Sequence, residues 1–196
     1  AEARSPARLG DAAPRLVGNL DGVPAAVRNA ENLKWIKRSA RSLTEQMSAT
    51  GGRSQIEDAR HRLEMLDQVK DALRTTGSAP KRSLLSVDPS GQGTASIVIG
   101  DLATADYVTY MVPGMFFKVD GQIDDWTDDA TELYNEQVAW LGRLDKGKPN
   151  ANKKTVAAVA WMGYKNPDLT HIGSLNLAYQ DRDALARLVE GMQANR

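Results

Sequence analysis

Apolar residues recur at helical spacing through the first third of the chain. Pro24 suits the first turn of a helix, and from there to Thr50 apolar positions alternate at intervals of three and four residues. These positions are Val27, Ala30, Leu33, Ile36, Ala40, Leu43 and Met47. A second series follows the Gly51-Gly52 turn, with Ser54 and Glu57 spaced as a capping box. Its apolar positions are Ile56, Ala59, Leu63, Leu66, Val69 and Leu73. The two series predict an antiparallel helical hairpin, which either packs as a layer on its neighbours or binds a partner.

After residues 77–80, which contain Gly and Pro, the pattern changes to short apolar runs. Four runs are typical of strands, at residues 83–87, 94–100, 107–112 and 155–162. The turn-forming residues 88–93 predict a β-hairpin between the first two runs, and Pro113-Gly114 ends the third. The fourth run is rich in Val and Ala without alternation, as expected of a central strand that is covered on both faces.

Helical spacing returns between the third and fourth strand-like runs and again near the end. The apolar positions of the first series are Ile123, Trp126, Ala130, Leu133, Trp140 and Leu144. Gln137 is the only polar interruption of this series, which ends before a loop at residues 146–154. A last helix is predicted over residues 181–192. The order of elements predicts an α/β fold with a mostly parallel sheet, in which a helical region at residues 1–80 precedes a sheet-containing domain at residues 81–196.

The composition excludes several classes of protein. Lys and Arg number 25 and Asp and Glu number 25, so the chain lacks the basic excess of a nucleic-acid-binding protein. The longest apolar run, residues 156–162, is far shorter than the roughly 18 residues that indicate a membrane span. The chain has no Cys, which excludes a disulfide framework, a thiolate zinc site and a Cys nucleophile. No signal peptide is recognisable in the given residues, and the cellular compartment cannot be read from them.

The order of elements, an antiparallel hairpin and then parallel strands with helices, resembles the first half of an α/β-hydrolase sheet. In that fold the next strand carries the nucleophile elbow, Gly-x-Ser-x-Gly, because the Ser lies on a strained turn that excludes neighbouring side chains. No Ser of this chain has that context, since none of Ser54, Ser90 and Ser174 has glycines at both required positions. We therefore expect the nucleophile to lie outside these residues.

Five motifs resemble an actinobacterial family of α/β-hydrolase-fold proteins of unassigned substrate. They are Gly18-Asn19-Leu20-Asp21-Gly22-Val23-Pro24, Asp88-Pro89-Ser90-Gly91-Gln92-Gly93, Ile99-Gly100-Asp101, Val112-Pro113-Gly114-Met115 and Val159-Ala160-Trp161-Met162-Gly163-Tyr164. Each motif alone is weak, but their order and spacing are specific, and the resemblance spans Leu16 to Met192. In that family a Gly-His-Ser-Tyr-Gly elbow, the acid and the His all follow the helix that corresponds to residues 181–192. The resemblance implies that the chain is the N-terminal part of such a protein, or a natural partial copy.

The resemblance also implies that one catalytic element lies within the chain. In α/β hydrolases one oxyanion-hole donor is a backbone N–H in the loop after the third strand, which maps to Pro113-Gly114-Met115-Phe116. The Met115 amide is the first candidate and Gly114 is the second. The family more often has Thr at position 115, although a backbone donor tolerates a different side chain. The alternative is that Pro113-Gly114 only ends a strand.

Four residues are candidates for lining a pocket near the predicted strand ends. They are Phe116, Trp161, Tyr164 and His171. His171 lies in the connection at residues 166–180, close to the strand ends where α/β folds bind ligands. A triad of His171 and Ser174 would need an orienting carboxylate and a strained turn, and the sequence signals neither. His61 lies off the apolar face of the second helix, which favours a solvated surface position.

An acidic cluster accompanies the helix that is predicted before the fourth strand. Its members are Asp120, Asp124, Asp125, Asp128, Asp129, Glu132 and Glu136. The spacing is not that of an EF-hand, and acids near a helix start are favoured by the helix dipole, so we interpret the cluster as a solvated face. Trp126, Trp140 and Trp161 occupy apolar positions, which favours the core. No glycine-rich nucleotide motif occurs, and no cofactor or metal is expected.

The sequence supports two hypotheses for function. In the first, the chain is the N-terminal portion of a serine hydrolase-like protein that cleaves ester or other acyl bonds, and it is inactive alone because the Ser, acid and His follow Arg196. In the alternative, it is a non-catalytic interaction protein that uses the helical hairpin, or one chain of a two-chain hydrolase. A half-sheet leaves an open edge of backbone groups. We therefore expect a missing C-terminal half or a second chain to complete the sheet, or the isolated chain to self-associate.

Overall fold

The computed structural model describes residues 14–49, 52–114, 117–147, 154–163 and 175–193. Its elements, in chain order, are α2 (Ala25–Ser48), α3 (Arg53–Ala72), β1 (Arg82–Asp88), β2 (Thr94–Gly100), β3 (Tyr107–Met111), α4 (Val119–Asp145), β4 (Val156–Met162) and α5 (Leu175–Gln193). A helical segment at residues 14–19 precedes them. Each predicted strand and helix is present, and α5 begins well before the predicted residue 181.

The four strands form one mixed sheet in the order β1-β2-β4-β3. β2 runs antiparallel to both β1 and β4, whereas β3 runs parallel to β4. A parallel pair needs a crossover connection, which α4 supplies between β3 and β4. The predicted α/β class, with N-terminal helices before a sheet that starts with an antiparallel hairpin, is confirmed. The expectation of a mostly parallel sheet is wrong for the described residues, because β2 pairs antiparallel with both of its neighbours and only β3 and β4 pair in parallel.

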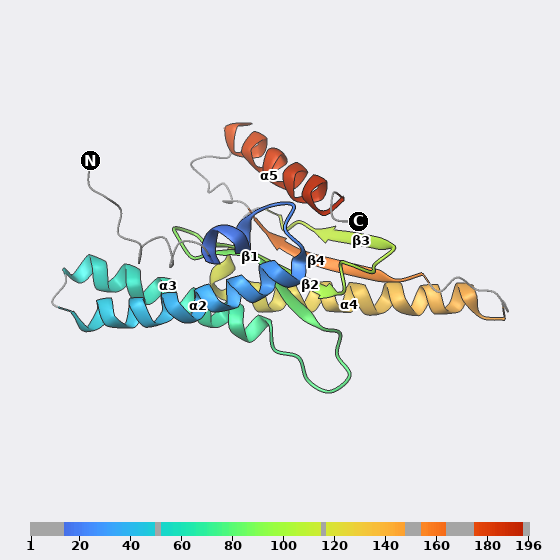
Figure 1. Ribbon diagram of the computed structural model, residues 1–196, viewed down its shortest axis with the longest axis horizontal. Helices are drawn as coiled ribbons and strands as arrows, with labels where there is room; N and C mark the ends of the chain where they lie inside the picture. The colour runs from blue at the N-terminus through green and yellow to red at the C-terminus, as the bar shows by residue number, and fades with distance from the viewer. Residues whose placement is uncertain (1–13, 50–51, 115–116, 148–153, 164–174, 194–196) are drawn as a thin grey trace.

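Helices cover both faces of the sheet (Figure 1). On one face α3 and the first half of α4 bury an apolar cluster that includes Leu66, Ile97 and Ile123. On the opposite face α5 adds Leu188 to a cluster that includes Val98. All residues of β4 are buried, as the sequence predicts for a central strand. The two cores therefore lie on either side of β2 and β4.

The helices α2 and α3 form the expected hairpin, which shares a core with the sheet. Ile36 and Leu43 of α2 belong to the same apolar cluster as Leu66 of α3 and Ile97 of β2. This cluster contains residues from both sides of residue 80, where the sequence predicts the boundary between a helical region and a sheet-containing domain. The division into residues 1–80 and 81–196 stays a prediction.

The first half of α2 buries polar residues where the sequence pattern predicts apolar ones. Val27 and Leu33 are 44% and 41% exposed, whereas Arg28 and Asn32 are buried. Ile36, further along the helix, is buried as predicted. The polar pair faces inward because both side chains bind the segment that precedes α2, as described below.

The start of α3 also differs from the prediction. Gly52 occupies the cap position and no side chain caps the helix, so the predicted capping box of Ser54 and Glu57 is wrong. The Glu57 carboxylate instead forms an ion pair with Arg53, at 2.9 Å on the exposed side of the helix. A residue four positions away on the same face offers a charged partner, which competes with the backbone amide that a capping box needs.

The second half of α4 extends beyond the sheet (Figure 1). Its 27 residues would span roughly 40 Å as a helix, whereas a strand as long as β4 spans roughly 23 Å. Trp140 and Leu144 are consequently 57% and 60% exposed, so the prediction that Trp140 lies in the core is wrong. Helical periodicity reports which side of a helix is apolar and does not report how far the neighbouring sheet reaches.

Asp106 joins the starts of the two parallel strands. Its carboxylate accepts hydrogen bonds from Lys154 Nζ and from the Thr155 backbone N–H, both at 2.8 Å. Its own backbone N–H donates to the Thr155 carbonyl oxygen at 2.9 Å. The hydrogen bond from Lys154 and that from the Thr155 amide hold the pKa of Asp106 at about 2, below its ordinary value of 3.8.

We expect Asp106→Asn to lower the melting temperature at neutral pH, because asparagine cannot form the ion pair with Lys154. The depressed pKa of Asp106 means that the folded chain binds the proton less readily than the unfolded chain does. The stabilisation is therefore fully present above about pH 4 and is lost as the pH falls toward about 2. Thermal unfolding followed by circular dichroism across this pH range measures the effect, with the exposed Asp124→Asn as control. A difference in melting temperature between the wild type and Asp106→Asn that stayed constant over this range would contradict the prediction.

Candidate functional site

The candidate site lies at the carboxyl edge of the parallel strands β3 and β4. β4 ends at Met162, which pairs with Ala95 at the start of β2, and Ala95 pairs with Val87 near the end of β1. Because β2 is antiparallel, its amino end shares this edge with the carboxyl ends of the other strands. Open α/β sheets bind ligands outside this edge, in the loops that follow the strands.

The segment between β3 and α4 lies at this edge and contains the candidate oxyanion donors. Pro113 is buried and Gly114 is exposed. No atom lies within 4 Å of the position that a Cβ would take at Gly114, so the backbone is open to close approach. Met115 and Phe116 lie outside the described residues. The role of Gly114 or Met115 as an oxyanion donor stays a prediction.

A hydrogen bond fixes the start of this segment. Trp126 Nε1 donates to the Met111 carbonyl oxygen at 3.3 Å, which ties the last residue of β3 to α4. The Trp126 ring also contacts the ring of Phe117, with 5.2 Å between the centroids. One side chain of α4 therefore touches both described ends of the segment, before and after its undescribed centre.

Trp161 lies at the end of β4 and is 4% exposed. It belongs to the apolar cluster that includes Leu188 of α5. A Cβ at Gly163 would come within 2.2 Å of the indole atoms Cε2 and Nε1, so this glycine allows the ring to lie against the backbone. The pocket-lining role of Trp161 stays a prediction. The candidates Tyr164 and His171 lie outside the described residues.

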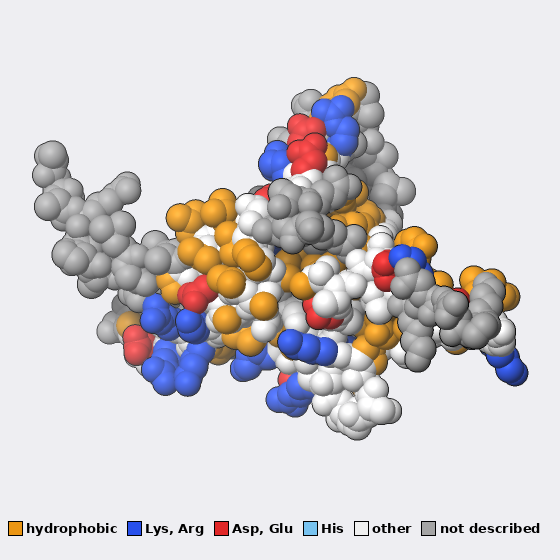
Figure 2. Space-filling view, turned by 45° about the vertical axis from the view of Figure 1, so that its right-hand side comes forward, with side chains coloured by type: hydrophobic (Ala, Val, Ile, Leu, Met, Phe, Trp, Pro, Cys, Tyr) orange, Lys and Arg blue, Asp and Glu red, His pale blue; other side chains and the backbone are white. Residues whose placement is uncertain are grey.

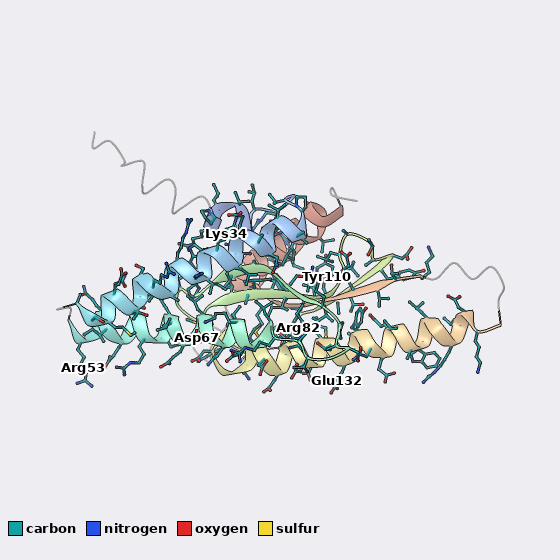
Figure 3. All side chains as sticks on the ribbon, turned by 60° about the horizontal axis from the view of Figure 1, so that its bottom comes forward. Lys34, Arg53, Asp67, Arg82, Tyr110 and Glu132 are labelled. Carbon is teal, nitrogen blue, oxygen red and sulfur yellow. The ribbon has the colours of Figure 1, made fainter. Side chains whose placement is uncertain are left out.

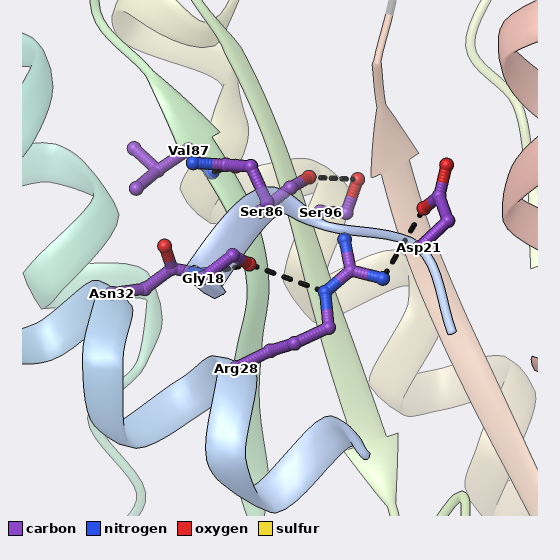
Figure 4. A network of polar contacts seen from close by, with 8 residues as sticks. Gly18, Asp21, Arg28, Asn32, Ser86, Val87 and Ser96 are labelled. Atoms are coloured by element: carbon purple, nitrogen blue, oxygen red, sulfur yellow. Dashed lines mark hydrogen bonds and ion pairs between the residues drawn. The ribbon is translucent and has the colours of Figure 1, made fainter. Parts of the chain in front are cut away.

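Buried polar side chains of α2 hold the segment at residues 18–21 (Figure 4). The Gly18 carbonyl oxygen accepts hydrogen bonds from Arg28 Nε at 3.1 Å and from Asn32 Nδ2 at 2.8 Å. Arg28 Nη1 lies 3.3 Å from Asp21 Oδ1. Burial lowers the pKa of Arg28, while the charge and hydrogen bond of Asp21 act in the opposite direction. Asp21 thus serves as the counter-ion of a buried guanidinium.

Two asparagine side chains cover the outer edge of β1. Asn19 Oδ1 accepts the Val87 N–H at 3.0 Å, and Asn29 Oδ1 accepts the Leu84 N–H at 2.7 Å. These contacts satisfy backbone donors of a strand that has no strand partner on that side in the described part of the chain. The motif at residues 18–24 therefore attaches the segment before α2 to the sheet. Sequence reasoning noticed the motif and missed its partners Arg28 and Asn32, because they occupy a helix face that the pattern predicts to be exposed.

A hollow of about 590 Å³ opens between this segment and the turn that joins β1 to β2. It is lined by Arg15, Leu16, Asn19, Leu20, Asp88 and Thr94. Arg15 forms an ion pair with Asp88 at 3.0 Å and lies over the Trp35 ring, 5.7 Å from its centroid. Asp88 pairs with Thr94 at the carboxyl edge. The hollow and the segment after β3 thus lie at the same edge of the sheet. The sequence shows no ligand-binding motif among the residues that line the hollow.

Two members of the acidic cluster on α4 have side-chain partners on other elements. Asp120 lies 3.4 Å from His61 Nε2 and accepts a hydrogen bond from Gln68, and Asp128 pairs with Arg82. Among the residues that the structure describes, no group of three His, Asp or Glu could hold a metal ion. None of the described helices combines the length and apolarity that crossing a bilayer requires.

We expect Gly18→Ala to destabilise the protein by about 1–3 kcal/mol, because an added methyl in a filled space forces its neighbours to move. A Cβ at position 18 would lie 2.0 Å from Asn32 Oδ1. Gly142→Ala is the matched control, since nothing lies within 4 Å of a Cβ there. In α4 this change should stabilise by about 0.5–1 kcal/mol through helix propensity. If urea unfolding showed that both variants change the free energy of unfolding in the same direction, the prediction would be contradicted.

Comparisons with known proteins agree with this architecture. A family model described as "Alpha/beta hydrolase" matches residues 88–196. Two proteins of Mycobacterium tuberculosis, "Uncharacterized protein Rv2079" of strain H37Rv and "Uncharacterized protein MT2140" of strain CDC 1551, are each 30% identical over 204 residues. The match covers 91% of this chain and 29% of each relative, so the chain spans less than a third of their length.

No solved structure matches the chain significantly. The family match covers more than half of the chain, and it includes three of the four strands and the segment with the candidate oxyanion donors. This chain therefore belongs to the α/β hydrolase family.

Proposed function

We propose that this chain forms the N-terminal part of a serine hydrolase-like protein that cleaves an ester or another acyl bond. The observation that carries the proposal is the family match over the half-sheet whose carboxyl edge holds the segment after β3. In α/β hydrolases this segment supplies one oxyanion-hole N–H. The mycobacterial relatives are much longer than this chain, which is compatible with further catalytic residues on additional polypeptide.

The proposed chemistry assigns this chain one role in acyl transfer. A Ser attacks the carbonyl carbon, a His takes and returns the proton, and backbone amides stabilise the oxyanion. The chain contains no Gly-x-Ser-x-Gly sequence, so the Ser, the His and the acid would come from outside it. Gly114 or Met115 would supply an oxyanion donor, whose loss in other enzymes costs roughly 3–4 kcal/mol of barrier. Without a nucleophile this donor catalyses nothing.

The surface along β3 and the end of α4 supports a further strand along the outer side of β3. Among the described residues no strand pairs with the outer side of β3. Its Tyr107 is 55% exposed, beside an apolar hollow of about 350 Å³ that Trp140 also lines. Gln137 Oε1, in the same lining, is buried without a hydrogen-bond partner, while its Nε2 donates to Thr109 Oγ1 at 2.8 Å. An unpaired acceptor and exposed apolar side chains beside an open strand edge favour an additional β-strand and helix.

An activity assay tests the proposal. We expect residues 1–196 alone to leave p-nitrophenyl esters intact, and the polypeptide extended through a Gly-x-Ser-x-Gly elbow to hydrolyse them. Replacement of the elbow Ser by Ala in the extended protein should abolish turnover. A folded extended protein that hydrolyses none of a series of acyl esters would exclude the catalytic proposal.

We expect the surface at the end of α4 to mediate association. Isolated residues 1–196 should form oligomers, and the double change Trp140→Lys and Leu144→Lys should shift them to monomer in sedimentation velocity. The matched control is Val27→Lys with Leu33→Lys, two similarly exposed apolar residues on α2. The control should leave the oligomers unchanged. A wild-type chain that sediments as a single monomeric species would contradict this expectation.

The second candidate is a non-catalytic interaction protein that uses the helical hairpin. Val27 and Leu33 favour it, because both are apolar side chains exposed on α2. The intact mass of the protein in its native source discriminates between the two candidates. A mass near 21.3 kDa would favour the interaction protein, and a much larger mass would favour the hydrolase.

A further inference from the structure

The segment that follows β3 ends at an irregular start of α4. Asp120 has a ψ of 116° and Gly121 a φ of 77°, so the regular helix begins only after these two residues. A positive φ of this size is accessible to glycine at little cost. The Lys118 N–H donates to Gln122 Oε1 at 2.7 Å, which closes a turn over the irregular residues. The conformation of this turn sets where the segment after β3 meets the helix.

One face of α3 contacts this turn. His61, Met65 and Gln68 are spaced at i, i+4 and i+7, which places them on the same side of the helix. Gln68 Oε1 accepts the Gly121 N–H at 2.8 Å, and Gln68 Nε2 donates to Asp120 Oδ1 at 3.2 Å. A single amide side chain thus binds both irregular residues. The second oxygen of Asp120 lies 3.4 Å from His61 Nε2.

An apolar contact lies beside the polar one. Val119 is 3% exposed. A Cβ added at Gly93 would come within 2.6 Å of Met65 Sδ and 3.3 Å of Val119 Cβ, so the turn between β1 and β2 packs closely against α3 and the start of α4. The turn at residues 119–121 is therefore held by apolar packing around Val119 and by the hydrogen bonds of Gln68. The hydrogen bond to Gln68 Oε1 gives the Gly121 N–H a fixed direction.

We propose that Gln68 is a positioning residue that fixes the Asp120–Gly121 turn, and with it the point where α4 continues from the segment that contains the candidate oxyanion donors. The helical hairpin before the sheet then has a role in the catalytic geometry in addition to its contribution to the core. This inference rests on the proposed hydrolase function for its catalytic meaning. The contact itself is defined by described residues alone.

Amide hydrogen exchange measures the positioning directly. Gln68→Met keeps the length of the side chain and removes both hydrogen bonds. We expect the Gly121 amide to exchange about five- to tenfold faster in this variant than in the wild type. Gln55→Met is the matched control, because Gln55 is exposed in the first turn of the same helix, far from Gly121. An unchanged exchange rate at Gly121 in Gln68→Met would overturn the proposal.

A rescue experiment separates positioning from a general loss of stability. Gln68→Glu retains an acceptor for the Gly121 N–H, but it places a carboxylate against Asp120 and should also speed exchange. Adding Asp120→Asn supplies an amide donor to Glu at position 68, so the double variant should return to within about twofold of the wild-type rate. Failure of Asp120→Asn to restore protection would count against a specific contact.

The same variants in the extended, elbow-bearing protein test the catalytic meaning. We expect Gln68→Met to lower kcat for p-nitrophenyl esters by about tenfold with little change in KM, since a misplaced oxyanion donor affects the transition state more than substrate binding. The Gln68→Glu and Asp120→Asn double variant should recover kcat. If the extended protein is inactive, the proposed function fails and the exchange data still decide the positioning. If it is active and Gln68→Met leaves kcat unchanged, the positioning proposal fails while the hydrolase proposal stands.

Discussion

The backbone groups at the two edges of the sheet impose the constraint on which this structure depends. An edge strand must give its N–H and C=O groups partners other than a strand, or remain open to pairing. At β1 the side chains of Asn19 and Asn29 accept backbone amides, and they are delivered by the N-terminal segment and by α2. At β3 the described chain supplies no strand on the outer side. The segment before α2 thus supplies partners for the outer edge of β1, whereas the outer edge of β3 has no strand partner among the described residues.

The sequence predicted the elements of the sheet well because their signals are local. Turn-forming residues delimit β1, β2 and β3, and the continuous apolar run of β4 reports burial on both faces. The face of α2 was mispredicted because Arg28 and Asn32 are buried by partners that are distant in sequence, namely the Gly18 carbonyl oxygen and Asp21. Periodicity assumes that apolar residues occupy the buried face. A guanidinium can also occupy the buried face of a helix when it has a counter-ion and a carbonyl hydrogen-bond partner, as Arg28 has.

The edge of the sheet at which the segment after β3 lies follows from the sequence, whereas the contacts at the two ends of this segment do not. The position of Gly114 after β3 follows from the order of strands, since a loop that leaves a parallel strand must lie at its carboxyl edge. The contacts that hold the loop, such as Gln68 with Gly121 and Trp126 with Met111, join residues that carry no motif. Figure 3 shows α3 and α4 with their side chains along one side of the sheet. Contacts of this kind depend on which helix faces meet, and tertiary packing decides that.

The hollow lies beside β1, at one side of the half-sheet, and β3 with its unpaired outer side lies at the opposite side. Figure 2 shows apolar side chains in more than one region of the surface that faces the viewer. Large exposed apolar residues occur both beside the hollow and on α4. Leu16 and Leu20 lie beside the hollow near β1, whereas Trp140 and Leu144 lie at the far end of α4.

The family match begins at residue 88, yet the core beneath β2 is completed by Ile36 and Leu66 from the preceding helices. β2 also takes its second neighbour, β1, from residues before the match. The matched part of the chain therefore relies on β1 for one strand partner and on the preceding helices for part of one core, so the helical hairpin and the sheet pack together.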